Sequence, residues 1–252
     1  WFFFSHCEGI NSKKDYLCST INAMITVERY TEAHKDAWDA FVRESKNGTF
    51  LFLRAYMDYH ADRFTDYSFL FFEEGELVAL LPACERRGVR ATLFSHAGLT
   101  YGGLVMSPRS TTVQVCRIFE ALMAHLRANG ISEFYYKPVP HIYHSYPSEE
   151  DLYALLHVCG AQIVGRSAST TLDLQHRLPM RERRLRYVRA VKRKGMQVVP
   201  SADFAAYWRI LCAVLADKYE AEPVHTLQEI EMLHRRFPDN IHLLLTVLDD
   251  NT

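Results

Sequence analysis

The feature of this sequence that most constrains its fold is an order of predicted elements that begins twice along the chain. Residues 63–66 (RFTD) and residues 236–239 (RFPD) each end a predicted helix, and each precedes an apolar predicted strand and an acidic turn. In both places one strand and two helices come before the tetrapeptide. We interpret the shared order as an internal duplication, which predicts an α/β fold made of two related units in tandem.

The first unit is predicted to cover residues 24–174. Its longest helix stops at Asn129-Gly130, a pair of residues typical of helix C-termini. The predicted strands are residues 25–30, 68–73, 77–82, 91–96, 133–137 and 162–174, and the predicted helices are residues 32–45, 54–63, 111–128 and 148–160. This alternation favours a mixed sheet flanked by helices.

A basic connecting helix is predicted over residues 175–195, and residues 196–252 are predicted to begin the second unit. The elements expected there are a strand at 196–200, helices at 202–217 and 226–236, and a strand at 241–248. The sequence stops in the turn where the hairpin partner of the last strand would follow. Natural proteins avoid apolar strands with an unpaired edge, so we expect the second unit to be truncated.

The first 23 residues differ from the ordered pattern that follows them. Met24 is the first methionine of that pattern and is followed at once by the strand-like residues 25–30. The opening apolar run, residues 1–4, lacks the charged region and the cleavage site of a signal peptide. We expect Met24 to be the natural start and residues 1–23 to be a non-native or disordered extension.

Composition and charge exclude several classes of protein. Hydrophobic residues make up 48% of the chain, enough for a sizeable buried core. The net charge of −1 gives no overall basic field for DNA, and no apolar run approaches the roughly 18 residues of a transmembrane helix. The six cysteines form no Cys-x-x-Cys pair and no zinc-ligand spacing. We therefore expect a cytoplasmic protein with free thiols and no metal site.

Two short stretches concentrate rings, glycines and titratable nitrogens where a predicted strand ends. They are residues 95–103 (SHAGLTYGG) and residues 135–144 (YYKPVPHIYH). Loops at strand ends often carry function on a rigid scaffold, so we predict that these two line a binding cleft. The predicted substrate-binding residues are His96, Tyr101, Gly102, Gly103, Tyr136, Lys137 and His144.

Several of these residues also have a structural interpretation. His96 follows an apolar strand and could be a core histidine bonded to the backbone, and residues 101–103 could serve only to shape a turn. Pro138 cannot donate to a strand ladder, so it places Lys137 at the end of its strand. The Lys137 ammonium group is suited there to a phosphate or a carboxylate, and the alternative is an ordinary surface lysine.

His141 and Tyr143 are the predicted catalytic residues. Histidine takes up protons near neutral pH, so His141 could accept the proton of an attacking amine, and Tyr143 could donate to a leaving group. The alternative is that these rings pack the loop onto the next helix. No Ser-His-Asp or Cys-His pattern with a nucleophile context is present, and direct acyl transfer needs none.

Residues 181–194 form a strongly basic segment, with eight basic residues and one acidic residue. Leu185, Val188 and Val191 recur at three-residue spacing, which predicts an amphipathic helix. One interpretation is a solvated helix face. The other is a site for an anionic ligand: a nucleotide, the acceptor end of a tRNA or an anionic lipid. Its predicted anion-binding residues are Arg184, Arg189, Lys192 and Arg193.

The element order of the first unit resembles that of GNAT acyltransferases. Two such units joined by a basic segment resemble the Fem family, which builds peptidoglycan cross-bridges, and its acetyltransferase-like relatives. The motifs that carry the resemblance are residues 47–50 (NGTF), 95–103, 137–143 (KPVPHIY) and 223–225 (PVH). The resemblance implies tandem GNAT-like domains with the second incomplete.

The resemblance also implies an activity. Its members move an acyl or aminoacyl group from acetyl-CoA, another acyl thioester or an aminoacyl-tRNA onto an amine of a small molecule or a cell-wall precursor. In the bridge-forming enzymes the first unit grips a nucleotide-linked peptidoglycan precursor, and the second unit supplies the donor channel. These are expectations for the present chain.

The sequence departs from the GNAT pattern at one motif. The GNAT fingerprint, Gln/Arg-x-x-Gly-x-Gly/Ala, opens the long helix and seats the CoA pyrophosphate on backbone amides. Here Gly98, Gly102 and Gly103 lie several residues before the helix that begins near Thr111. The acyl-donor site is therefore expected beyond Thr252. The alternative function is a non-catalytic binding module for an anionic nucleotide- or glycan-linked ligand.

Overall fold

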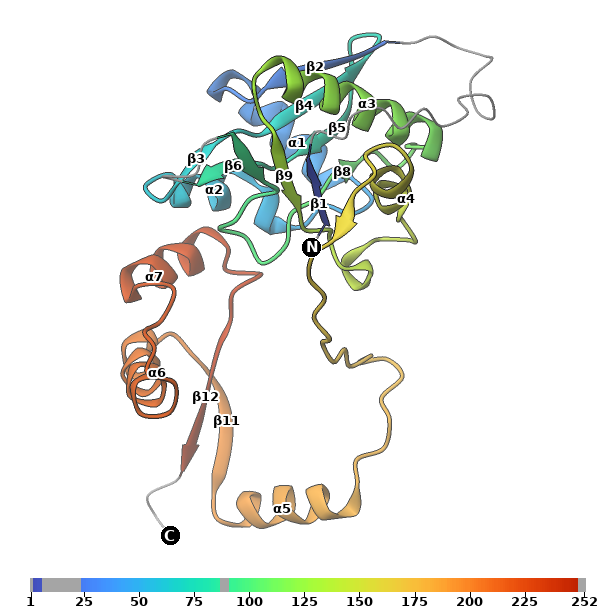
Figure 1. Ribbon diagram of the computed structural model, residues 1–252. Coiled ribbons are helices and arrows are strands. Elements are labelled where there is room, and N and C mark those ends of the chain that lie inside the picture. The colour runs from blue at the N-terminus through green and yellow to red at the C-terminus, as the bar shows by residue number, and fades with distance from the viewer. Residues whose placement is uncertain (1, 6–23, 87–90, 249–252) are drawn as a thin grey trace. The chain divides into compact units, whose positions relative to one another are not determined.

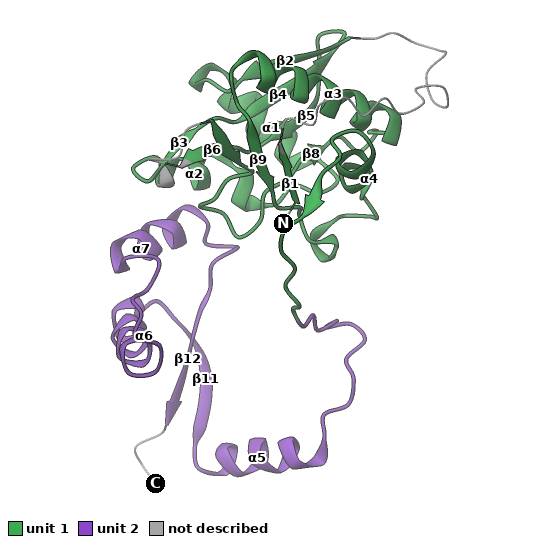
Figure 2. Cartoon of the chain, viewed as in Figure 1, with its two compact units in different colours: residues 1–169 green, residues 170–252 purple. Residues whose placement is uncertain are grey.

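The computed structural model describes residues 2–5, 24–86 and 91–248 of the chain. The chain divides into two compact units, unit 1 with residues 1–169 and unit 2 with residues 170–252, which Figure 2 colours separately. The boundary between them lies close to residue 174, where the sequence pattern predicts the end of the first unit.

Unit 1 combines short helices with two sheets (Figure 1). Its helices are α1 (Lys35–Glu44), α2 (Arg54–Met57), α3 (Thr112–Ala128) and α4 (Glu150–His157), with the 3₁₀ turns η1 (Glu32–His34), η2 (Phe50–Phe52), η3 (Asp58–His60) and η4 (His141–Tyr143). Its strands are β1 (Phe2–Ser5), β2 (Ile25–Arg29), β3 (Phe64–Asp66), β4 (Phe69–Glu73), β5 (Glu76–Leu81), β6 (Cys84–Arg86), β7 (Thr92–Phe94), β8 (Val105–Met106), β9 (Glu133–Tyr136) and β10 (Gln162–Ile163).

The first sheet, in the order β2-β4-β5-β8, has a hydrophobic cluster on each face. Successive side chains of a strand point to opposite faces. Phe69 and Phe71 of β4 join the cluster that contains the buried side of α3, whereas Leu70 joins the cluster that contains Trp38 of α1. Burial on both faces explains why β4 is a continuous apolar run in the sequence.

The second sheet, in the order β10-β1-β9-β7-β6-β3, places the two ring-rich loops together. β7 and β9 run parallel, with Leu93 opposite Phe134 and Phe94 opposite Tyr135. Parallel neighbours end at the same edge of a sheet. The segments that follow these strands, beginning at Ser95 and Lys137, therefore leave the sheet side by side.

Residues 2–5 of the predicted extension form regular structure, and the expectation that residues 1–23 are a non-native or disordered extension otherwise stays a prediction. Phe2–Ser5 form β1, which pairs with β9 on one side and with β10 on the other. The Phe4 ring is 3% exposed and packs edge-on against Phe134, with ring centroids 5.2 Å apart. Aromatic residues favour such half-buried strand positions. Residues 6–23 lie outside the described residues.

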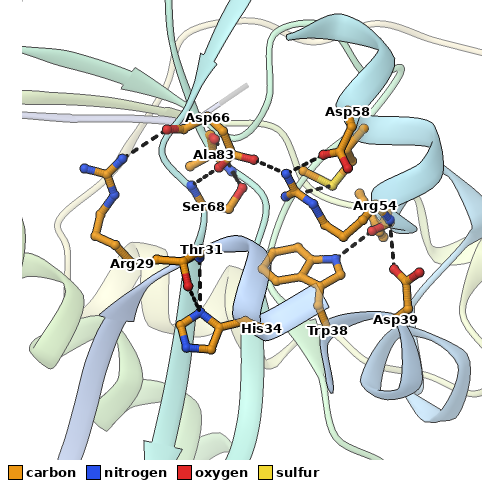
Figure 3. A network of polar contacts seen from close by, with 12 residues as sticks. Arg29, Thr31, His34, Trp38, Asp39, Arg54, Asp58, Asp66, Ser68 and Ala83 are labelled. Atoms are coloured by element: carbon orange, nitrogen blue, oxygen red, sulfur yellow. Dashed lines mark hydrogen bonds and ion pairs between the residues drawn. The ribbon is translucent and has the colours of Figure 1, made fainter. Parts of the chain in front are cut away.

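The second predicted helix is shorter than the sequence pattern suggests. α2 covers only Arg54–Met57, and the chain then passes through η3 into β3. Arg54 explains this tight path. Its side chain is 3% exposed, and its guanidinium group is bonded to the carboxylates of Asp58 and Asp66 (Figure 3). It also lies over the Tyr30 ring, 3.7 Å from the centroid. A buried cation needs such partners, so these residues hold α2 next to β3 and the residue that follows β2.

Unit 2 contains α5 (Glu182–Arg193), β11 (Met196–Ser201), α6 (Phe204–Tyr219), α7 (Leu227–Arg236) and β12 (Leu243–Leu248). β11 and β12 pair antiparallel along their whole length, from Met196 opposite Leu248 to Ser201 opposite Leu243. The strand predicted at 241–248 thus has a partner on one edge, which is the first strand of its own unit. The strand predicted over residues 162–174 is reduced to β10, and residues 164–181 have no regular structure.

The structure also corrects the register of the predicted repeat. Residues 64–66 are strand β3, paired with β6, whereas Phe237 is the residue that ends α7. The two tetrapeptides therefore do not occupy equivalent positions. The units do share a strand, then helices, then a strand that pairs antiparallel with the first: β2 with β4, and β11 with β12. The tandem duplication remains a prediction that rests on this shared order.

Candidate functional site

Hydrogen bonds join the two ring-rich loops where they leave the second sheet. The Lys137 amide donates to Ser95 Oγ at 2.7 Å, and the Gly102 amide donates to the Lys137 carbonyl at 3.0 Å. The Ser95 amide in turn donates to the Tyr135 carbonyl at 2.8 Å. Ser95 is buried, so these bonds form in a site shielded from water and fix the two loops relative to each other.

Two glycines allow the loops to approach this closely. A Cβ at Gly102 would lie 1.8 Å from the Ser95 carbonyl oxygen, so no other residue fits that position. Gly103 has a φ of +93°, and its backbone lies against Pro138 and Val139. Both glycines are buried and serve loop packing, which favours the turn-shaping interpretation, and their contact with substrate stays a prediction.

A third segment, residues 45–49, completes the arrangement. The Asn47 side chain donates to the Leu104 carbonyl and accepts from the Met106 amide, both at 2.8 Å. The Lys46 ammonium group, 2% exposed, pairs with Glu150 of α4 at 2.5 Å. A Cβ at Gly48 would lie 2.4 Å from the Val42 carbonyl oxygen. The NGTF motif is thus a tightly packed segment next to β8.

Tyr101 and Tyr143 stack on each other across the loops. Their ring centroids are 5.0 Å apart and their planes are inclined by 29°. The Tyr101 hydroxyl donates to Thr49 Oγ1 at 3.1 Å, and the Phe52 ring packs edge-on against Tyr101. Tyr101 is 5% exposed whereas Tyr143 is 49% exposed, so the buried ring supports the exposed one.

We call the accessible residues of these segments the loop cluster: Thr49, Lys137, His141, Tyr143 and His144. His141 and Tyr143 are exposed on η4, and the other three are half-buried. Burial lowers the pKa of Lys137 and also that of His144, whose Nε2 lies 3.2 Å from the Val139 carbonyl oxygen. A half-buried ammonium group can bind an anion or a carbonyl oxygen. His141 and Tyr143 keep their predicted catalytic roles as proposals.

Two predicted substrate-binding residues are buried. Tyr136 is fully buried, so direct contact with substrate is ruled out for it and the prediction is corrected. Its hydroxyl donates to Asp151 and accepts from the Leu104 amide. His96 is 4% exposed, has a φ of +58° and packs on the Phe64 ring with centroids 5.9 Å apart. The structure thus favours the core interpretation of His96.

Sequence reasoning missed the buried polar groups beneath the loop cluster. Asp151 is 4% exposed, and burial raises its pKa to about 6. An acidic residue in the first turn of a helix ordinarily stabilises that helix through the macrodipole, so nothing in the sequence set Asp151 apart. Asn47 did stand out, in the NGTF motif, although its role as a bridge between Leu104 and Met106 is visible only in the structure.

The predicted anion-binding residues lie in unit 2 on α5. Arg184, Arg189, Lys192 and Arg193 are all exposed, and no residue of α5 is buried. Arg189 pairs with Glu182 at 3.0 Å, with both side chains more than half exposed. Exposed pairs of this kind contribute little to stability, so α5 is open to either interpretation of its charge.

Within the described residues, no group of three or more His, Cys, Asp or Glu side chains is arranged to hold a metal ion. None of the described helices combines the length and the hydropathy that crossing a membrane requires.

Neither a protein-family model nor a curated protein matches this sequence. Among solved structures the chain is similar to "Crystal structure of FemX", with a TM-score of 0.50 and 13% sequence identity. The match covers 89% of this chain and 58% of FemX, so the chain spans less than two thirds of that protein. At this identity the likeness concerns the fold alone. The chain therefore has a mixed α/β fold similar to that of FemX.

Proposed function

We propose that this chain belongs to a Fem-like transferase and that its loop cluster binds the amine-bearing acceptor. The observation that carries the proposal is the stack of exposed Tyr143 on Tyr101 next to the end of β9, where Lys137 is half-buried. A rigid ring and a cation on tightly bonded loops form a preorganised binding surface. The similarity to the FemX fold supports this assignment.

The proposed reaction is the transfer of an acyl or aminoacyl group to the acceptor amine. The amine nitrogen bonds to the carbonyl carbon of the donor, and the C–S bond of a thioester or the C–O bond of an aminoacyl ester breaks. The proton lost by the amine balances the proton gained by the leaving thiol or hydroxyl. His141, exposed on η4, is proposed to take the amine proton, and Tyr143 to donate to the leaving group. The donor site is assigned to the portion of a FemX-like fold that this chain does not span.

Lys137 is proposed to recognise a phosphate or carboxylate of the acceptor. Burial lowers its pKa, because desolvation disfavours the charged form. A bound anion would stabilise the charged form of Lys137 and add a charge-assisted hydrogen bond, worth about 1.5–3 kcal/mol. A nucleotide-linked cell-wall precursor offers both the anion and the amine.

Isothermal calorimetry against a UDP-linked muramyl peptide and against acetyl-CoA tests this proposal. We expect the peptide to bind and acetyl-CoA to leave no heat signal. Lys137→Ala should weaken peptide binding about tenfold or more, which follows from the loss of one such bond. Lys35→Ala is the matched control, because Lys35 is an exposed lysine of α1 in the same unit. Absence of peptide binding by the folded chain, or equal losses in the two variants, would contradict the proposal.

A non-catalytic binding module is the second candidate. The observation that favours it is the start of α3, where Thr111 caps the helix through a bond from the Gln114 amide at 3.3 Å. No glycine-rich loop precedes this helix end, so a donor pyrophosphate has no backbone cradle at α3. Peptide binding without transfer by a chain extended to the full length of FemX would select this alternative.

A further inference from the structure

We infer that Asp151 is a positioning residue of the loop cluster, which it holds in place through a chain of hydrogen bonds. Asp151 Oδ2 accepts from the Tyr136 hydroxyl at 2.5 Å, and the hydroxyl oxygen accepts from the Leu104 amide at 2.6 Å. The chain begins on α4, passes through the end of β9 and ends on the loop that carries Tyr101. This inference rests on the proposed function of the loop cluster.

The hydrogen bonds from Asp151 through Tyr136 to Leu104 lie where they can hold both loops in place. Leu104 follows Gly103, and a Cβ at Gly103 would lie 3.1 Å from the same Tyr136 hydroxyl oxygen. Tyr136 precedes Lys137, whose carbonyl accepts from the Gly102 amide. The Tyr136 hydroxyl is therefore in contact with one loop while its backbone leads into the other. Loss of this contact releases the backbone next to Tyr101 and Lys137 together.

The charge of Asp151 requires an explanation beyond stability. A neutral amide could accept the same bond from Tyr136, whereas a carboxylate at 4% exposure pays a desolvation penalty. The short distance between the two oxygens is typical of a bond to an ionised acceptor, which is about twice as strong as a neutral one. A charged acceptor also makes the Tyr136 oxygen a better acceptor for the Leu104 amide. The charge of Asp151 thus strengthens the hydrogen bonds that hold the loop, while its desolvation lowers the free energy of unfolding.

Within the Asp151–Tyr136–Leu104 network, Asp151 is the group whose charge changes with pH. Glu150, its neighbour on α4, is paired with Lys46 at 2.5 Å. Burial raises the pKa of Tyr136 far above neutral, so the phenol stays protonated. Cys159, after α4, acts electrostatically on Tyr136, and Glu149 precedes α4. On α3, the helix packed against α4, Arg117 pairs with Glu73 at 2.7 Å. In the loop cluster, burial lowers the pKa of His144.

Amide hydrogen exchange at Leu104, followed by NMR from pH 5 to pH 7.5, tests the positioning role. Protection factors, which correct for the intrinsic pH dependence of exchange, should fall about tenfold in the wild type as pH drops through the pKa of Asp151, about 6. Asp151→Asn should show a change of less than about twofold over the same range, because its side chain keeps one charge state. Glu149→Gln, an exposed carboxylate of the same segment, should behave as the wild type.

Two further measurements separate the possible failures. Tyr136→Phe removes the hydroxyl and should abolish the pH dependence at Leu104, so it decides the question if Asp151→Asn does not fold. An unchanged pH dependence in either folded variant, or a flat wild-type profile, would overturn the inference. The affinity for the UDP-linked muramyl peptide should fall with the Leu104 protection, and an affinity unaffected by loss of protection would also overturn it. If no peptide binds at any pH, the proposed function fails, and the exchange data still decide whether Asp151 holds the loop.

Discussion

The exposed ring of Tyr143 rests on the buried ring of Tyr101, with centroids 5.0 Å apart and planes inclined by 29°. Tyr101 is itself held by Thr49 and Phe52, so the stack connects a surface ring to the core of unit 1. A supported ring loses little conformational entropy when a ligand packs on it. This is the physical basis for assigning ligand binding to the loop cluster.

Tyr143→Ala should weaken acceptor binding by about 2- to 13-fold, because an aromatic pair is worth about 0.5–1.5 kcal/mol. Tyr143→Phe should keep the binding contribution of the stack and lose only the proposed proton donation. Calorimetry with the UDP-linked muramyl peptide measures both. Tyr153→Ala, an exposed tyrosine on α4, serves as the control and should bind as the wild type. An equal loss in the Tyr143 and Tyr153 variants would remove the loop cluster from ligand recognition.

Arg54→Met should lower the free energy of unfolding by about 3–5 kcal/mol, since it leaves the buried side of the Asp58 and Asp66 carboxylates without a cation. Burial already raises the pKa of Asp58, and Arg54 is the group that opposes this rise. Urea denaturation followed by circular dichroism gives the value. Arg43→Met provides the comparison: Arg43 is 63% exposed and 3.9 Å from Asp39, so its loss should change stability by less than about 0.5 kcal/mol. Similar values for the two variants would show that the Arg54 network is not a structural centre.

Gly102→Ala should destabilise unit 1 by about 1–3 kcal/mol, because the new Cβ overlaps backbone atoms of Ser95 that cannot move independently of the sheet. Gly75→Ala separates this overlap from simple backbone strain. Gly75 has a φ of +86° and open space around it, so its substitution reports a left-handed backbone penalty of about 1 kcal/mol alone. Thermal or urea denaturation should rank Gly102→Ala as the more harmful change, and the reverse order would disprove the close approach of the loops.

The raised pKa of Asp151 predicts how stability depends on pH. The folded chain binds a proton at Asp151 with a pKa of about 6, above the ordinary value of 3.8, so protonation favours the folded state. Its contribution is therefore neutral at low pH and becomes destabilising as pH rises from about 4 to 6, reaching about 3 kcal/mol above that range. Asp151→Asn should unfold at higher urea concentration than the wild type at pH 7.5, and the advantage should vanish near pH 4. A variant less stable than the wild type at pH 7.5 would show that the charge stabilises the fold.

Much of unit 1 could be predicted from periodicity and caps. The α3 helix, predicted over residues 111–128, begins at Thr112 and ends before Gly130. The strands predicted at 68–73 and 77–82 form the β4–β5 hairpin around Gly75. These features are determined by neighbouring residues, so they can be predicted from the sequence. The sequence predicts the strands β11 and β12 but not their antiparallel pairing, because the pairing joins residues separated by two helices.

The missed features all depend on contacts between distant residues. β1 lies between β9 and β10 although nearly 130 residues separate Phe4 from Phe134 in the chain. Arg54 was read as part of a longer helix, because its partner Asp66 lies beyond that helix in a separate strand. Tyr136 was predicted to bind substrate on the strength of its ring, whereas its burial follows from α3 and α4 packing over β9. The loop positions of Lys137 and Tyr143 were predictable because prolines and strand ends mark them locally.

The most direct test of the ligand-binding role of the loop cluster is an NMR titration of the chain with a UDP-linked muramyl peptide, following the amide signals of both units. We expect the largest shift changes at Thr49, at residues 101–104 and at residues 137–144, with Lys137→Ala reducing them. Changes concentrated on α5 or elsewhere, with the loop cluster unaffected by saturating peptide, would contradict the assignment of the acceptor site to unit 1.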